Sequence, residues 1–211
     1  MFDGVSNFAN SVDTTLLFTL IVSVFFLVLI TVTMIYFVIK YNRKRNPKAV
    51  NVHSNTALEV TWTVIPTILV LIMFWFGWVN YLEESNIPED AMPIEVTAQM
   101  WQWSFKYENG KQTDSLYVPV DTPIKLNLNS LDVNHSFFVP AFRVKKDVYP
   151  GLSRSTWFQA GQTGRYHIAC AEYCGLNHSY MSSTIIVMPK NEFNDWISDT
   201  TAVDTIKSVN K

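Results

Sequence analysis

Cysteine is almost absent from this chain of 211 residues, which contains only Cys170 and Cys174. No CxxCH motif occurs, so the sequence offers no attachment site for a c-type haem. It also lacks internal repeats and a glycine-rich nucleotide-binding loop. Its 16 basic and 18 acidic residues nearly balance, and no nucleic-acid partner is expected. These absences leave the two cysteines as the most informative residues of the chain.

Charge is missing from two long apolar runs, residues 16–39 and 60–82. At a rise of about 1.5 Å per residue, a helix of either length spans a hydrocarbon core of about 30 Å. The alternative is a pair of buried helices in a soluble protein. Runs this long without a charge disfavour that alternative. We expect transmembrane helices at residues 15–39 and 59–82, the first acting as an uncleaved anchor.

The segment between the runs has no acidic residue before Glu59, and it carries Lys40, Arg43, Lys44, Arg45 and Lys48. Cytoplasmic loops of membrane proteins are enriched in lysine and arginine. The pattern therefore predicts a cytoplasmic loop at residues 40–58, with an external N-terminal segment at residues 1–14 and the C-terminal part also outside. We expect a bacterial cell membrane rather than a mitochondrial inner membrane.

From about residue 91 onward the hydrophobic period changes to two. Turn residues such as Asn109-Gly110 and Pro150-Gly151 separate several short β-rich runs, at residues 94–97, 124–129, 155–159 and 184–188. This spacing predicts an antiparallel β-sandwich or barrel over residues 83–190. A short helix from residue 191 to 198 and a mobile tail to residue 211 complete the expected organisation.

Two thiols, an imidazole and a thioether occur within the twelve residues from Cys170 to Met181. This donor set selects copper over hard, oxygen-preferring cations, whereas zinc sites more often show paired CxxC units. A second cysteine in one loop suggests two metals bridged by two sulfurs, and His135 could supply another imidazole. The alternative is a CxxxC disulfide, which would leave His178 and Met181 unexplained.

Three motifs resemble subunit II of the haem–copper terminal oxidases, cytochrome c oxidase in particular. They are residues 55–66 (NTALEVTWTVIP), the segment Met100-Trp101-Gln102-Trp103, and a Cys-x-Glu-x-Cys-x3-His-x2-Met block with an upstream Asp-x-x-His-Ser. The resemblance covers nearly the whole chain. It implies a membrane α-helical hairpin followed by an all-β cupredoxin-like domain.

The resemblance also implies a dinuclear copper A centre. Its ligands would be two bridging thiolates, one imidazole for each copper and two weak ligands: Cys170, Cys174, His135, His178, Met181 and the backbone carbonyl of Glu172. The carboxylate of Glu172 would bind a magnesium ion at the boundary with subunit I, since hard carboxylates suit that cation. The alternative is that this carboxylate is simply solvated.

Further roles follow from the same resemblance. Trp101 would be the electron-input tryptophan, although packing in the core beside Trp103 is an alternative for an aromatic residue in a strand. Glu59 matches an acid at the cytoplasmic mouth of a proton channel, but an acid there would also complement a helix dipole. Asp132 matches an acid that docks the electron donor, beside the first histidine ligand.

The implied partners are a haem-bearing subunit I, other oxidase subunits, membrane lipid, and cytochrome c or a membrane-bound cytochrome c donor. From Glu83 onward the chain has 15 acidic and 11 basic residues, a net charge of −4 that favours a basic cytochrome c. Met100, Gln102 and Lys106 depart from the family pattern. Competing interpretations are a quinol oxidase subunit II, a thioredoxin-like copper chaperone, and an adhesion or scaffolding sandwich with a disulfide.

Overall fold

The computed structural model describes residues 4–48, 50–51 and 53–199. The expected mobile tail from residue 200 onward lies outside the described residues. The chain divides into two compact units. One is a helical unit of residues 13–81, and the other is a β-rich unit formed by the chain before residue 13 and after residue 81.

Among the described residues, two helices are long and apolar enough to cross a membrane, α1 (Ala9–Lys40) and α2 (Thr56–Ser85). Their apolar windows contain no buried residue. The side-chain oxygen of Asn55 accepts a hydrogen bond from the backbone N–H of Leu58 at 3.2 Å and so caps the start of α2. Both helices extend beyond the expected spans, because a charge-free run marks the apolar part of a helix and not its polar ends.

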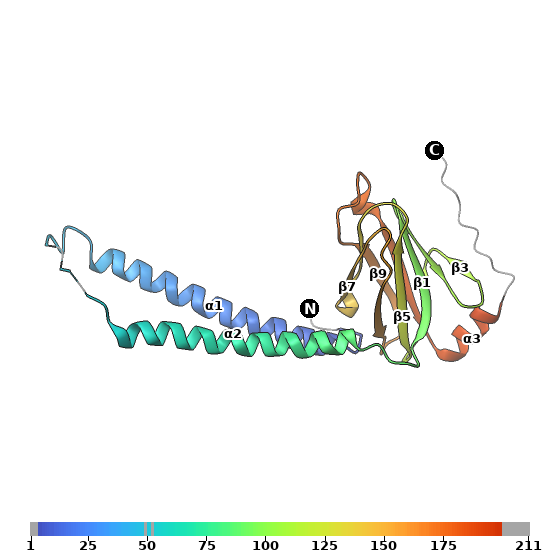
Figure 1. The fold of residues 1–211 in the computed structure, drawn as a ribbon, viewed down its shortest axis with the longest axis horizontal. Helices are drawn as coiled ribbons and strands as arrows, with labels where there is room; N and C mark the ends of the chain where they lie inside the picture. The colour runs from blue at the N-terminus through green and yellow to red at the C-terminus, as the bar shows by residue number, and fades with distance from the viewer. Residues whose placement is uncertain (1–3, 49, 52, 200–211) are drawn as a thin grey trace. The chain divides into compact units, whose positions relative to one another are not determined.

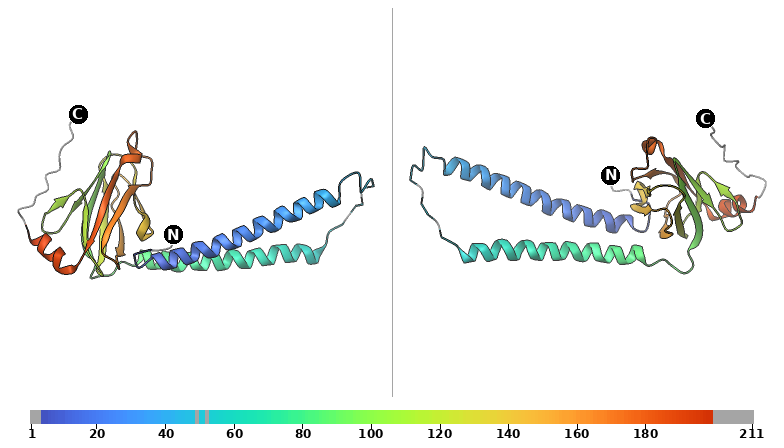
Figure 2. Two further views of the ribbon diagram at one scale, coloured as in Figure 1. Left: turned by 180° about the vertical axis from the view of Figure 1, so that it is seen from behind. Right: turned by 45° about the horizontal axis from the view of Figure 1, so that its top comes forward.

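Ten strands in the described part of the chain form two five-stranded sheets (Figures 1 and 2). The first sheet has the order β3-β2-β1-β5-β8, with β1 (Met92–Gln99), β2 (Gln102–Lys106), β3 (Gln112–Thr113), β5 (Pro123–Ser130) and β8 (Arg154–Gln159). The second has the order β4-β10-β9-β6-β7, with β4 (Leu116–Pro119), β6 (His135–Val139), β7 (Val144–Val148), β9 (Gly164–Cys170) and β10 (Ser182–Met188). Three short helices follow individual strands: η1 (Pro140–Phe142), η2 (His178–Tyr180) and α3 (Lys190–Ser198).

The expectation of a purely antiparallel sandwich is wrong for two strand pairs. β1 pairs with β5 in parallel, and β4 pairs with β10 in parallel. Alternation along a strand reports which face each side chain occupies and carries no information on the direction of the neighbouring strand. The predicted strands and the predicted short helix near residue 190 are all present.

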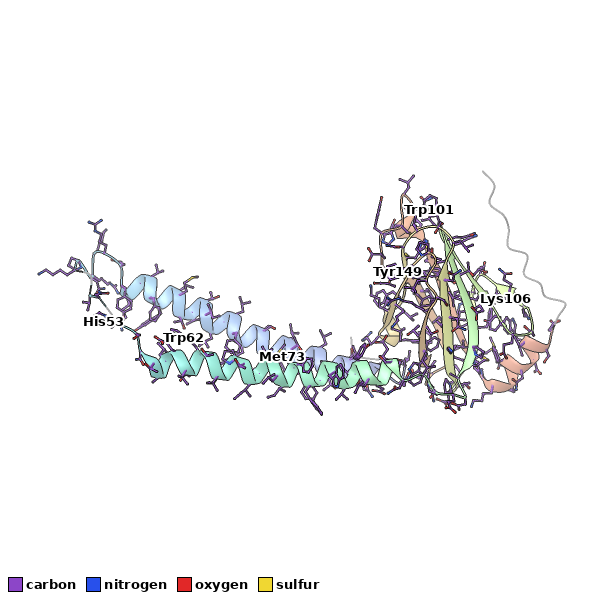
Figure 3. All side chains as sticks on the ribbon, in the orientation of Figure 1. His53, Trp62, Met73, Trp101, Lys106 and Tyr149 are labelled. Atoms are coloured by element: carbon purple, nitrogen blue, oxygen red, sulfur yellow. The ribbon has the colours of Figure 1, made fainter. Side chains whose placement is uncertain are left out.

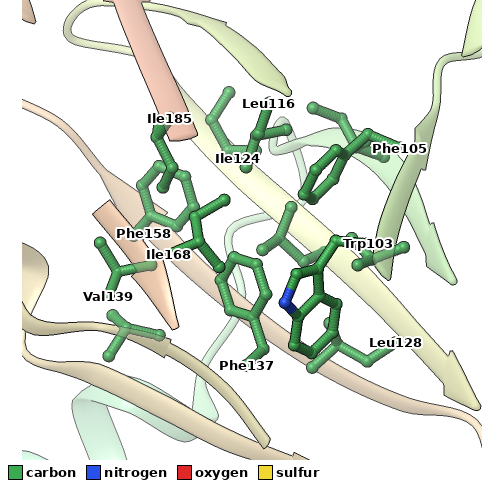
Figure 4. Close-up of a cluster of buried hydrophobic side chains, with 14 of the residues drawn as sticks. Trp103, Phe105, Leu116, Ile124, Leu128, Phe137, Val139, Phe158, Ile168 and Ile185 are labelled. Carbon is green, nitrogen blue, oxygen red and sulfur yellow. The ribbon is translucent and has the colours of Figure 1, made fainter. Parts of the chain in front are cut away.

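The core lies between the two sheets, where alternate residues of the strands meet (Figure 4). Trp103 of β2 is 3% exposed, and its ring packs edge-on against Phe137 of β6 at a centroid distance of 5.5 Å. The same indole lies 6.2 Å from the ring of His135. Trp103 therefore belongs to the core, and its packing supports the start of β6, where His135 lies.

The segment before α1 is part of the β-rich unit. The N–H of Asn7 donates to the carbonyl of Gln159 at 3.1 Å, and the N–H of Gln159 donates to the Asn7 side chain at 2.8 Å. Phe8 packs edge-on against Trp157 at 5.0 Å. This segment therefore covers β8, an edge strand that would otherwise expose its backbone groups.

Candidate metal centre

Three neighbouring strands of the second sheet hold the cysteine loop. His135 is the first residue of β6, and Cys170 is the last residue of β9. The N–H of Ala171 donates to the carbonyl of Ser136 at 3.0 Å, and the N–H of Cys170 donates to the carbonyl of Met181 at 3.1 Å. The first bond thus fixes the start of the loop against the strand that carries His135, and the second joins the two ends of the loop to each other.

Within the loop, a turn directs His178 back toward the cysteines. Gly175 has a φ of +115°, a conformation that side-chain-bearing residues rarely adopt. The N–H of His178 donates to the Gly175 carbonyl at 3.2 Å and begins η2. A Cβ at position 175 would also lie 3.4 Å from the ring of Trp101. Glycine therefore permits both the turn and the close approach of the indole.

All six predicted ligands converge around the two sulfurs. Sγ of Cys170 lies 3.8 Å from Sγ of Cys174. The remaining donors lie close to one sulfur or the other. The distances from Cys170 Sγ are 3.9 Å to His135 Nδ1 and 3.3 Å to Glu172 O, and those from Cys174 Sγ are 3.5 Å to His178 Nδ1 and 3.7 Å to Met181 Sδ. His135, Cys170, Cys174 and Met181 are all buried.

The spacing suits donors that share a metal ion. With metal–donor bonds of about 2.0–2.3 Å, two ligands in a roughly tetrahedral arrangement are separated by about 3.3–3.8 Å. A disulfide would require an S–S distance of about 2.05 Å, whereas both cysteines are free. Thiolate, imidazole and thioether donors favour copper. The residues present therefore fit a copper centre.

A carboxylate orients the first histidine. Nε2 of His135 lies 2.8 Å from Oδ1 of Asp132, while Nδ1 faces Cys170. A carboxylate that hydrogen-bonds the other ring nitrogen of a metal-binding histidine commonly fixes its tautomer in this way. Burial opposes ionisation of Asp132. Hydrogen bonds from His135 and from the N–H groups of Met100 and Val133 outweigh burial and lower the pKa of this carboxyl group. The sequence interpretation missed this orienting contact, although the Asp-x-x-His spacing could have indicated it.

Burial and the neighbouring Cys170 raise the pKa of the Cys174 thiol to about 12. In the absence of a cation the thiol is therefore neutral at physiological pH. A metal that binds both sulfurs must displace protons, as thiolate sites generally require. A bound cation would therefore stabilise the thiolate form that burial and the neighbouring sulfur disfavour.

Trp101 lies beside the loop at the same end of the sandwich (Figure 3). It is half-buried, and its indole Nε1 donates to the carbonyl of Cys174 at 3.2 Å. Lys106 is at the opposite end of β2, away from this site. Glu172 has an exposed side chain, although its carbonyl faces Cys170. Glu59 is half-buried in the first turn of α2, where both of its predicted roles stay open.

The β-rich unit does not suit a thioredoxin-like chaperone, because its two cysteines belong to a strand–loop–strand segment between β9 and β10. A quinol oxidase subunit II is expected to lack copper ligands. It is disfavoured because all six donors lie together in this chain. An adhesion sandwich stabilised by a disulfide is disfavoured by the free thiols.

Comparisons with known proteins cover both units. A family model for the transmembrane domain of cytochrome c oxidase subunit II matches residues 1–77, and one for its periplasmic domain matches residues 111–188. The crystal structure of the periplasmic domain of subunit II of cytochrome oxidase of Bradyrhizobium japonicum superposes with a TM-score of 0.51. The two sequences are 32% identical, and the matched region covers 53% of this chain and 94% of the Bradyrhizobium chain.

Relatives of full length are also similar. Cytochrome c oxidase subunit 2 of Alkalihalophilus pseudofirmus is 36% identical over 188 residues, 83% of this chain. This chain spans only 55% of that relative's length. Cytochrome c oxidase subunit 2 of Cereibacter sphaeroides is 26% identical over 220 residues, covering 85% of this chain and 73% of that protein. The matches to both domain models and to the solved periplasmic domain show that the chain belongs to the cytochrome c oxidase subunit II family, with a membrane hairpin and an extracytoplasmic cupredoxin-like domain.

Proposed function

We propose that this chain is the electron-input subunit of a haem–copper oxidase. It would accept electrons from cytochrome c, or from a membrane-bound cytochrome c donor, at a dinuclear copper centre. It would then pass them to haem in subunit I, where oxygen is reduced and protons are pumped. The observation that carries the proposal is the convergence of six donors on two buried sulfurs.

The ligand assignment follows from the position of each donor. Cys170 and Cys174 would bridge two coppers, since each sulfur has its own imidazole neighbour at 3.9 or 3.5 Å. Met181 and the carbonyl of Glu172 would be the weak ligands, one for each metal. Such a centre shares one electron between two metals, so that neither metal changes its geometry much on reduction. A rigid β frame suits this chemistry because it holds the ligands in one arrangement.

Asp132 and Trp101 would act on this centre without binding it. Asp132 holds His135 with Nδ1 directed at the centre, and its two oxygens are already engaged by protein donors. These contacts favour an orienting role, while its docking role stays a prediction. The hydrogen bond from Trp101 to the Cys174 carbonyl provides a short route from the surface to a bridging ligand.

Two further roles remain proposals. The exposed carboxylate of Glu172 could bind magnesium on the side facing subunit I, because its carbonyl is directed toward the copper centre and leaves the side chain available. Glu59 could admit protons at the cytoplasmic side. For Glu59 the contacts of the described residues support helix-dipole complementarity equally well. A bacterial cell membrane remains the expected location.

Rapid mixing of reduced cytochrome c with the assembled oxidase tests the proposed function. We expect the copper absorption of this subunit to change before the haem absorption of subunit I. The copper-loaded chain without subunit I should accept electrons but consume no oxygen, because the proposal assigns oxygen reduction to subunit I. Oxygen reduction by the isolated chain, or haem reduction that precedes copper reduction, would contradict the proposal.

A further inference from the structure

One indole contacts both ends of the membrane hairpin. Trp157 belongs to β8, and its ring packs edge-on against Phe8, the residue that precedes α1, at a centroid distance of 5.0 Å. Its Nε1 donates to the backbone carbonyl of Glu83, in the last turn of α2, at 3.3 Å. The chain before residue 13 and after residue 81 belongs to the β-rich unit, so both contacts lie within that unit.

The burial of Trp157 is explained by these two contacts. Phe158 pairs with Ile124 and faces the core, whereas Trp157 pairs with Lys125 and lies on the opposite face of β8. The side chains on that same face of the neighbouring strand β5 are half-buried. Trp157 is nevertheless only 8% exposed. The core between the sheets does not cover this face, so the burial reflects the attachment of the two hairpin ends.

The hydrogen bond to Glu83 satisfies a backbone group at the end of a helix. The last four carbonyls of an α-helix have no partner within the helix, and the carbonyl of Glu83 is in that last turn. A second attachment lies nearby, where Nζ of Lys146 is 3.9 Å from a carboxylate oxygen of Glu84. Both of these side chains are partly exposed, and an ion pair of this kind contributes little. The indole is therefore the stronger of the two attachments.

The start of α1 is attached differently, through hydrogen bonds that do not involve Trp157. The N–H of Gly161 donates to the Val5 carbonyl at 2.8 Å, and the hydroxyl of Ser6 donates to the Phe142 carbonyl at 2.6 Å. These bonds would persist if Trp157 were replaced. We therefore expect a change at position 157 to loosen the end of α2 more than the segment before α1.

Resting on the proposed function, we propose that Trp157 is a positioning residue for electron transfer out of the copper centre. A β-rich unit held at one end of the hairpin could turn about that point, and attachment of both ends at one indole opposes this motion. The electron acceptor is in the membrane-embedded subunit I, so the copper centre must keep a constant distance from it. Trp157 belongs to the sheet opposite to the one whose strands β6 and β9 carry His135 and Cys170, so it would act without altering the metal site.

Two variants of the assembled oxidase test this proposal. Trp157→Phe keeps a ring against Phe8 but removes the N–H, and Trp157→Leu removes both contacts. We expect the rate constant for electron transfer from copper to haem to fall by about threefold in the first variant and about tenfold in the second. The rate of copper reduction by cytochrome c and the copper spectrum should not change. Trp196→Phe, which alters an indole of α3, is the matched control and should leave both steps unchanged.

Hydrogen exchange of the copper-loaded chain in lipid nanodiscs measures the attachment itself. In Trp157→Phe we expect the amides of residues 83–87 to exchange about tenfold faster than in the wild type. The amides of residues 5–9 should exchange at the wild-type rate, because the hydrogen bonds of that segment remain. This measurement requires neither subunit I nor an electron donor.

Unchanged copper-to-haem rates in both variants would overturn the proposal, as would unchanged exchange at residues 83–87. An equal loss in both electron-transfer steps, with an altered copper spectrum, would also overturn it, because Trp157 would then only stabilise the β-rich unit. If Trp157→Leu does not assemble with subunit I, the rates of Trp157→Phe and its hydrogen exchange decide the question. If copper in the wild-type oxidase never reduces the haem, the proposed function itself fails, which is a distinct result.

Discussion

The loop from Cys170 to Met181 and the membrane hairpin differ in the contacts that determine their structure. In the loop, Cys170, Cys174 and Met181 are buried, and backbone hydrogen bonds join Ala171 to Ser136 of β6 and Cys170 to Met181 across the loop. In the hairpin, the apolar windows of both helices contain no buried residue. Some cross-helix contacts exist, including an Asn80–Thr15 hydrogen bond at 2.9 Å.

The difference indicates where substitutions matter. A position in the hairpin must mainly be apolar and compatible with a helix, so many residues satisfy it. A position in the copper loop must place one atom within a few tenths of an ångström of several others. The metal-binding residues therefore lie in the region where several long-range contacts fix the positions of the same atoms.

Of the substitutions considered, Cys174→Ser should have the largest effect, and it should act on the copper loop alone. Sγ of Cys174 lies within 3.8 Å of Cys170, His178 and Met181, so its loss removes a donor from the middle of the site. We expect the variant to lose the dinuclear spectrum and to bind at most one copper. Ile72→Val, a matched conservative change in the hairpin, should leave copper content unchanged. Retention of two coppers by the serine variant would show that Cys174 is not a bridging ligand.

Trp101→Phe should affect electron input without affecting the metal. The substitution removes the indole N–H that bonds to the Cys174 carbonyl, but it removes no ligand. We expect electron transfer from cytochrome c to slow by orders of magnitude, with copper content and absorption intact. Trp196→Phe, which alters an indole of α3 that stacks on Tyr117, is the control and should not change the transfer rate. A wild-type transfer rate in the Trp101 variant would show that Trp101 only packs against the loop and is not the point of electron input.

Asp132→Asn should weaken the metal site by an intermediate amount. Its carboxylate orients His135, and loss of a group that hydrogen-bonds a metal ligand typically costs about 10–100-fold in metal affinity. Competition with a copper chelator measures this change. If Asp132 acts only in docking, copper affinity will stay the same and only the salt-sensitive association with the donor will weaken.

Asp147→Asn should have the smallest effect, on the pH dependence of folding. The hydrogen bond from Lys145 lowers the pKa of Asp147, so this acid stabilises the folded state above the ordinary pKa of about 3.9. That stabilisation is lost as pH falls through the lowered pKa. For a partly exposed pair it amounts to less than about 1 kcal/mol. Denaturation of wild type and variant at pH 7 and pH 3 should show a difference at pH 7 that shrinks at pH 3; a constant difference would exclude the ion pair as its source.

Much of the fold and the site could be predicted because the signals are local. Charge-free runs indicate the hairpin, alternation indicates the strands, and five of the six proposed ligands occur within one short loop. The convergence of His135 with Cys170 followed from donor chemistry and from family resemblance, since 35 residues separate them.

Features that depend on distant partners were not predictable in this way. The parallel pairing of β1 with β5 joins strands about 30 residues apart, and alternation is the same for either direction. Coverage of β8 by the segment before α1 joins residues more than 150 positions apart.

Electron paramagnetic resonance of the oxidised chain, combined with copper quantification, tests the central claim most directly. We expect two coppers for each chain and a hyperfine pattern from one unpaired electron shared equally by two copper nuclei. Free thiols should be recovered after the metal is removed. A pattern from a single copper nucleus, or a chain without copper whose two cysteines form a disulfide, would contradict the account.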